Sequence, residues 1–62
     1  MKNPWIRVTR PYDGGELALM HNTVNGKTAV NFVNKWGEVS TPMYNATINR
    51  LVSDMKKELR IS

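Results

Sequence analysis

Few side chains in this 62-residue chain have the types and spacing that enzyme chemistry requires. There is one histidine and no cysteine, and the five acids form no pair spaced for shared acid–base work. His21 lies in an alternating apolar segment, where a histidine more often packs than acts as a general base. Asp13, Glu16 and His21 do not match the spacing of metal ligands. The sequence therefore predicts that the protein is not an enzyme and has no metal, cofactor or small-molecule substrate.

The charge balance favours anionic partners. Nine lysines and arginines against five acids give a net charge of +4. Such a charge attracts nucleic acid, acidic proteins or membrane headgroups. No apolar run resembles a signal peptide or a membrane span, so we expect a cytoplasmic protein with no membrane partner.

Three strands are predicted from alternation and turn residues. Residues 5–10 alternate with period two, as a half-buried strand does. Residues 11–15 should turn, because two glycines permit positive φ. Two further strands are expected over 16–24 and 27–36, on either side of Asn25-Gly26, a strong signal for a two-residue hairpin turn.

That turn sets a register in which Leu19 opposes Phe32 and Glu16 opposes Lys35. Side chains alternate between the two faces of a sheet, so the register divides them into a core face and an open face. The core face is expected to carry Ile6, Val8, Leu17, Leu19, His21, Val30 and Phe32.

An amphipathic helix is expected over about 42–60. Thr41 is a suitable N-cap, Pro42 suits the first helical position, and Arg50 and Asp54 are spaced as an i,i+4 ion pair. An apolar stripe at three- and four-residue spacing should cover the core face of the sheet, and consists of Tyr44, Ile48, Leu51, Val52, Met55 and Leu59. The predicted fold is a single small α+β domain over residues 1–62, a three-stranded antiparallel β-meander packed against one C-terminal α-helix.

The open sheet face is the main candidate binding site. Arginine and asparagine can pair with base edges, lysine and threonine can hold phosphates, and an aromatic ring can stack. The residues expected to bind nucleic acid, most simply DNA, are Trp5, Arg7, Thr9, Lys27, Asn31 and Lys35. A second basic region, formed by Lys56, Lys57 and Arg60, lies at the helix end.

A protein interface is the alternative interpretation of the same face. Trp5, Met20 and Val33 make it less polar than a purely solvated surface, and such a patch is typical of binding sites. The partner would be a second copy of the chain, or a larger protein on which this one docks as an inhibitor or accessory factor.

The order of the elements resembles two DNA-binding families. Asn25-Gly26-Lys27 at the second hairpin and the helix that begins near Thr41 are similar to the arm-site domains of some phage integrases and to plant AP2-type domains. The resemblance implies a sheet face that enters the major groove. Together with the small size, it suggests an accessory protein of a phage or mobile element.

Overall fold

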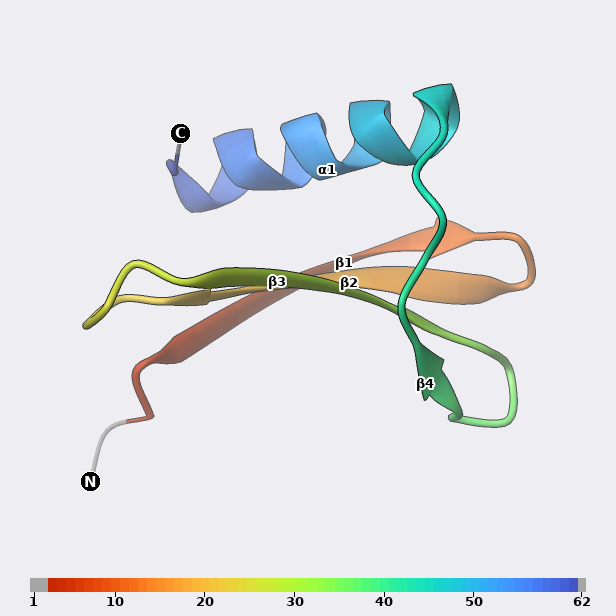
Figure 1. The fold of residues 1–62 in the computed structure, drawn as a ribbon, viewed down its shortest axis with the longest axis horizontal. Helices are drawn as coiled ribbons and strands as arrows, with labels where there is room; N and C mark the ends of the chain where they lie inside the picture. Colours follow the sequence, from red (N-terminus) through yellow and green to blue (C-terminus); the bar gives the residue numbers. More distant parts are fainter. Residues whose placement is uncertain (1–2, 62) are drawn as a thin grey trace.

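The computed structural model describes residues 3–61 and shows an antiparallel sheet followed by one helix (Figure 1). The strands are β1 (Trp5–Tyr12), β2 (Gly15–Asn22), β3 (Thr28–Val33) and β4 (Val39–Ser40), and the helix is α1 (Ala46–Leu59). They form a four-stranded sheet in the order β1-β2-β3-β4. The α+β meander with a C-terminal helix is therefore confirmed, and the short β4 is a strand that the sequence did not predict.

One face of the sheet is covered by α1, which crosses β1 and β2 (Figure 1). The buried core consists of Val8, Leu17 and Leu19 from the sheet and Ile48, Val52 and Met55 from the helix. These sheet residues belong to the predicted core face. Burying each such side chain contributes about 2 kcal/mol, so the helix is held mainly by this stripe.

The β1–β2 turn is the type I′ turn of the molecule. Asp13 (φ 46°) and Gly14 (φ 77°) both have positive φ, as the two central residues of that turn require. Gly15 has another role, because a Cβ placed on it would lie 2.2 Å from the Val33 carbonyl oxygen. A glycine at this position lets β3 pass close to the start of β2.

The β2–β3 turn is longer than the expected two residues. The Asn22 side-chain oxygen accepts hydrogen bonds from the backbone N–H groups of Val24 (2.9 Å) and Asn25 (3.1 Å), and the Asn22 N–H donates to the Lys27 carbonyl (2.8 Å). Leu19 therefore opposes Val30, and Leu17 opposes Phe32. The predicted register was wrong by two residues, and an even shift leaves every strand residue on its predicted face.

A second asparagine ends β3 earlier than predicted. The Asn34 side-chain oxygen accepts from the N–H groups of Trp36 (3.0 Å) and Glu38 (2.9 Å), and the Asn34 N–H donates to the Glu38 carbonyl (3.0 Å). Lys35 and Trp36 therefore lie in a turn and not in β3, and the chain then reverses direction to form β4.

Pro42 explains why β4 has two residues. The hydrogen bond from the Asn34 N–H to the Glu38 carbonyl shows that the backbone groups of Asn34 point toward β4. Because backbone groups alternate in direction along a strand, those of Val30 point toward β4 as well. Since Phe32 opposes Ser40, the residue opposite Val30 would be Pro42, which has no N–H to donate. The ladder ends before it.

The helix begins later than expected because Asn45, not Thr41, is the N-cap. The Asn45 side chain accepts from the Ile48 N–H at 2.8 Å, while its own backbone is extended. Tyr44 therefore lies before the helix and is 57% exposed, so its predicted place in the apolar stripe was wrong. The C-terminal Arg60 cap adopts a left-handed conformation, and its N–H bonds to the carbonyls of Lys56 and Lys57.

Candidate functional site

The sheet face opposite α1 gathers most of the residues predicted to bind. The register aligns its members in rows across the strands, in which Arg7 opposes Met20 and Met20 opposes Ala29. We define the open sheet face by its side chains, which are Trp5, Arg7, Thr9, Pro11, Glu16, Ala18, Met20, Asn22, Ala29, Asn31, Val33 and Val39.

Two of the predicted contacts lie outside the strands that form that face. Lys27 lies in the β2–β3 turn, and Lys35 lies in the turn that Asn34 forms. The Lys35 ammonium sits 4.6 Å from the ring centroid of Trp36, a cation–π contact on an exposed turn. The expected pairing of Lys35 with Glu16 was wrong, because Glu16 opposes Val33.

The open sheet face is close to neutral. Its one cation among the described residues is Arg7, and the Arg7 guanidinium lies 3.6 Å from the Glu16 carboxylate. Both side chains are about half exposed, so the pair is a surface ion pair of modest strength. Phosphate binding needs uncompensated positive charge, which this face does not present.

The free edge of β1 is partly blocked within the chain at its two ends. The Pro4 carbonyl accepts from the Thr23 N–H, so alternation turns the backbone groups of Trp5, Arg7, Thr9 and Pro11 outward. The Trp5 N–H already donates to the Asn3 side chain at 3.0 Å. The Thr9 carbonyl accepts from the Arg10 guanidinium at 2.9 Å, and the proline has no N–H. Such blocking disfavours the addition of another strand at this edge.

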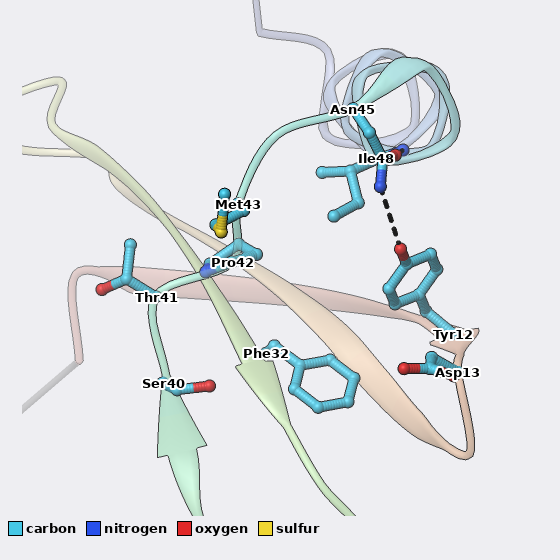
Figure 2. A pocket seen from close by; sticks show the side chains of 9 residues that line it. All are labelled: Tyr12, Asp13, Phe32, Ser40, Thr41, Pro42, Met43, Asn45 and Ile48. Atoms are coloured by element: carbon cyan, nitrogen blue, oxygen red, sulfur yellow. Dashed lines mark hydrogen bonds between the residues drawn. The ribbon is translucent and has the colours of Figure 1, made fainter.

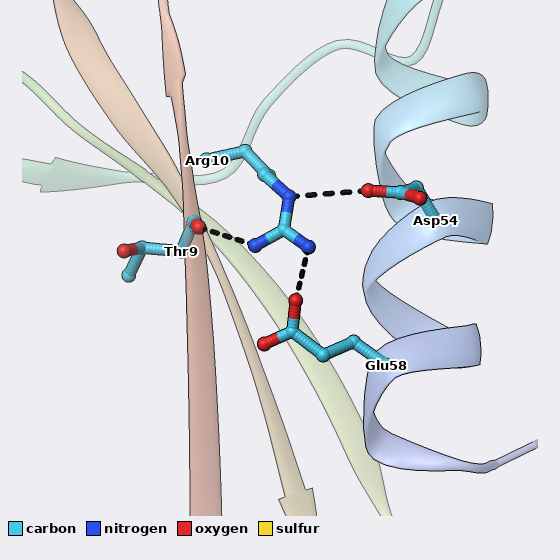
Figure 3. A network of polar contacts seen from close by, with 4 residues as sticks. All are labelled: Thr9, Arg10, Asp54 and Glu58. Atoms are coloured by element: carbon cyan, nitrogen blue, oxygen red, sulfur yellow. Dashed lines mark hydrogen bonds and ion pairs between the residues drawn. The ribbon is translucent and has the colours of Figure 1, made fainter.

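Arg10 joins β1 to two acids of the helix (Figure 3). Its Nε donates to the Asp54 carboxylate at 3.1 Å, and its Nη2 donates to the Glu58 carboxylate. These hydrogen bonds, to Glu58 first and Asp54 second, raise the pKa of Arg10, so the guanidinium stays protonated. The predicted pairing of Asp54 with Arg50 was therefore wrong. Alternation in β1 could have revealed Arg10, since it shares the helix-facing side with Val8.

The uncompensated positive charge lies along α1 and at its C-cap. We define the α1 basic surface as Arg50, Lys56, Lys57 and Arg60, and none of these forms an ion pair within residues 3–61. Lys56 and Lys57 also stand in the last helical turn, where cations complement the helix dipole. The turn that carries Lys27 lies at the same end of the long axis as the last turn of α1 (Figure 1).

A cleft of about 340 Å³ lies between the β1–β2 turn, the segment after β4 and the start of α1 (Figure 2). Tyr12 and Phe32 line it as a T-shaped aromatic pair with ring centroids 6.0 Å apart. The Asn45 amide donates to the Tyr12 hydroxyl at 3.2 Å. Asp13 is the ionisable lining residue besides that tyrosine, so the cleft offers no acid–base pair.

His21 and the acids of the described residues are not grouped as catalytic or metal-binding residues are. The His21 Nδ1 lies 3.1 Å from the Thr28 hydroxyl, which supplies its hydrogen-bond partner. Across residues 3–61, no group of three histidines or acids is placed to hold a metal ion. In the same range, no helix has the length and apolar character needed to cross a bilayer.

Comparisons with protein-family models, curated proteins and solved structures find no match to this chain. The surfaces described above therefore carry the functional argument by themselves.

Proposed function

We propose that the protein is a nucleic-acid-binding module that holds the phosphate backbone through the α1 basic surface. One observation carries the proposal: four cations of one exposed helix lack an acidic partner within residues 3–61, while both acids of that helix bond to Arg10. The surface that faces outward is therefore positive, although the helix sequence mixes both signs.

The dimensions of the surface suit a nucleic-acid backbone. From Arg50 to Leu59 the helix rises about 14 Å, at 1.5 Å per residue, and Arg60 follows as the C-cap. That length matches the rise of about four base pairs of duplex DNA, at 3.4 Å per phosphate on each strand. Phosphate contacts carry no sequence information, so duplexes of different sequence should bind with similar affinity.

The proposal moves nucleic-acid binding away from the open sheet face. There Arg7 is paired with Glu16, and Lys27 and Lys35 lie in turns. A nucleic-acid partner would place the protein in the cytoplasm, and its small size would suit an accessory protein of a phage or mobile element. The neutral, partly apolar open sheet face better fits the alternative role in protein association, which is developed below.

Two variants with equal net charge separate the surfaces. Arg50→Gln with Lys57→Gln changes the α1 basic surface, and Arg7→Gln with Lys35→Gln is the matched control. The affinity for a fluorescent duplex is measured against salt concentration by anisotropy. We expect the helix variant to reduce the slope of log K against log salt by about 1.8, at about 0.9 per lost phosphate contact, and the control to leave it unchanged.

Two results would overturn the proposal. If the control variant loses the slope and the helix variant keeps it, the nucleic-acid surface includes Arg7 or the turn that carries Lys35, and not the α1 basic surface. If the wild-type protein shows no salt-sensitive binding to duplex or single strand at low salt, nucleic-acid binding is not its function.

A further inference from the structure

We propose that the open sheet face is a dimer interface at which two copies of the chain pack face to face. The proposal uses a surface separate from the α1 basic surface, so it stands or fails independently of nucleic-acid binding. Three features support a second copy as the occupant: the charge pattern of the face, its exposed apolar side chains and the partly blocked edge of β1.

The charge pattern of the face is self-complementary. Arg7 and Glu16 lie 3.6 Å apart on one sheet face of a protein whose net charge is +4. A two-fold axis that lies in the interface, passes through the midpoint of this pair and is perpendicular to the line joining the two residues places each Arg7 opposite Glu16 of the second copy. An isologous interface of this kind uses the same patch on both subunits. A strongly acidic partner would be drawn instead to the α1 basic surface.

The face exposes apolar side chains that a partner would cover. Trp5 is 41% exposed at one end, and Val39 is 64% exposed at the other. Met20 and Val33 lie between them and are partly buried. The polar members, Thr9 and Asn31, lie in the middle row and can hydrogen-bond across a two-fold axis.

The area of the face suits only a weak dimer. The four strands contribute eight, eight, six and two residues, and at about 3.3 Å per residue and about 4.8 Å between strands they cover roughly 380 Å². Each copy would then bury roughly 380 Å², or about 760 Å² in total, which is below the size of a standard stable interface. The expected dimer is therefore weak and depends on protein concentration.

Association through the face is favoured over association through the β1 edge. Of the outward-facing positions of β1, the Trp5 N–H and the Thr9 carbonyl already have partners, and Pro11 has no N–H. A second copy that paired along the whole length of this edge would have to break these contacts.

Charge reversal tests the interface directly. Arg7→Glu gives a face with two acids, and Glu16→Arg gives a face with two cations. We expect sedimentation velocity to show that each variant alone loses self-association by about tenfold or more, since like charges then meet across the axis. An equimolar mixture of the two should form a heterodimer, because each acid then faces an arginine of the other chain.

The mixture separates contacts between chains from contacts within a chain, since neither variant can form its internal pair. Circular dichroism verifies that both variants are folded, and Lys57→Glu on the opposite side of the molecule is the control that should still dimerise. A wild-type protein that stays monomeric at millimolar concentration would overturn the proposal. Single variants that self-associate like the wild type, or a mixture that stays monomeric, would overturn it too.

Discussion

Arg10 should control nucleic-acid binding although it is not part of the α1 basic surface. In the structure its guanidinium bonds to the two carboxylates of α1, Asp54 and Glu58. Replacing it by methionine keeps an unbranched side chain and releases both acids. Asp54 stands four residues after Arg50, a spacing at which ion pairs form on a helix, so the freed acid can neutralise a cation of the surface.

The size of the effect follows from the local charge. The four cations of the α1 basic surface, together with Arg10 and the two acids, leave a net charge of +3. Arg10→Met reduces this to about +2, and the triple variant Arg10→Met, Asp54→Asn, Glu58→Gln raises it to about +4. If each unit of local net charge neutralises one phosphate, at about 0.9 per phosphate, the slopes of log K against log salt should be about −2.7, −1.8 and −3.6 for the three proteins.

Fluorescence anisotropy with a labelled duplex over a salt series measures these slopes. Circular dichroism at the same temperature establishes that each variant is folded, because Arg10 also ties β1 to α1. Arg7→Met is the matched control, since it removes one charge from the far face and should keep the slope of the wild type. Equal slopes for Arg10→Met and Arg7→Met, or a triple variant that binds no more steeply than the wild type, would refute the reasoning.

Three predictions concern the scaffold and can be checked by urea denaturation followed by circular dichroism. Gly15→Ala should lower the free energy of unfolding by about 3 kcal/mol, the upper end for overpacking. The added methyl group would meet backbone atoms at the end of β3, which cannot move aside as a flexible side chain can. A Cβ at Gly14 would meet open space, so Gly14→Ala should lower the free energy of unfolding by only about 1–2 kcal/mol, because of its positive φ. If Gly15→Ala lost less stability than Gly14→Ala, the close approach of β3 to Gly15 would be contradicted. Asn45→Ala should lose about 1 kcal/mol as an N-cap, whereas Thr41→Ala should change stability by less than about 0.5 kcal/mol. Met55→Ala removes a fully buried side chain and should lower the free energy of unfolding by about 2–5 kcal/mol. A decrease below about 1 kcal/mol would mean that α1 does not pack against the sheet as described.

The two faces of the sheet could be predicted because the face of a strand residue depends only on whether its position is odd or even, and not on the exact register. Val8, Leu17 and Leu19 are buried as expected even though the register between β2 and β3 differs by two residues. The two Asn/Asp-Gly pairs could not be told apart from sequence, because both are turn signals. Asp13-Gly14 forms the turn with two positive φ values, whereas only Gly26 of the second pair has positive φ.

The strand ends could not be predicted because asparagine side chains decide them. An asparagine in a strand can point to solvent, or its carbonyl oxygen can accept N–H groups of the residues that follow. The side-chain oxygens of Asn22 and Asn34 accept N–H groups of the residues that follow them, and β2 and β3 end at these asparagines. The consequence for the candidate site is large, since Lys27 and Lys35 lie just beyond these ends, in turns and not in the strands that form the open sheet face.

The position of each surface follows from where the five acids find partners. Glu16 pairs with Arg7 on the open sheet face, while Asp54 and Glu58 pair with Arg10 between β1 and α1. Two arginines of one strand thus engage three of the five acids, one arginine on each side of the sheet. The face with the Arg7 pair becomes neutral and suited to a second copy of the chain. The described cations of α1 and of its C-cap are left without ion-pair partners, so a dimer through the sheet would present two positive helices on opposite sides and could bridge two nucleic-acid segments.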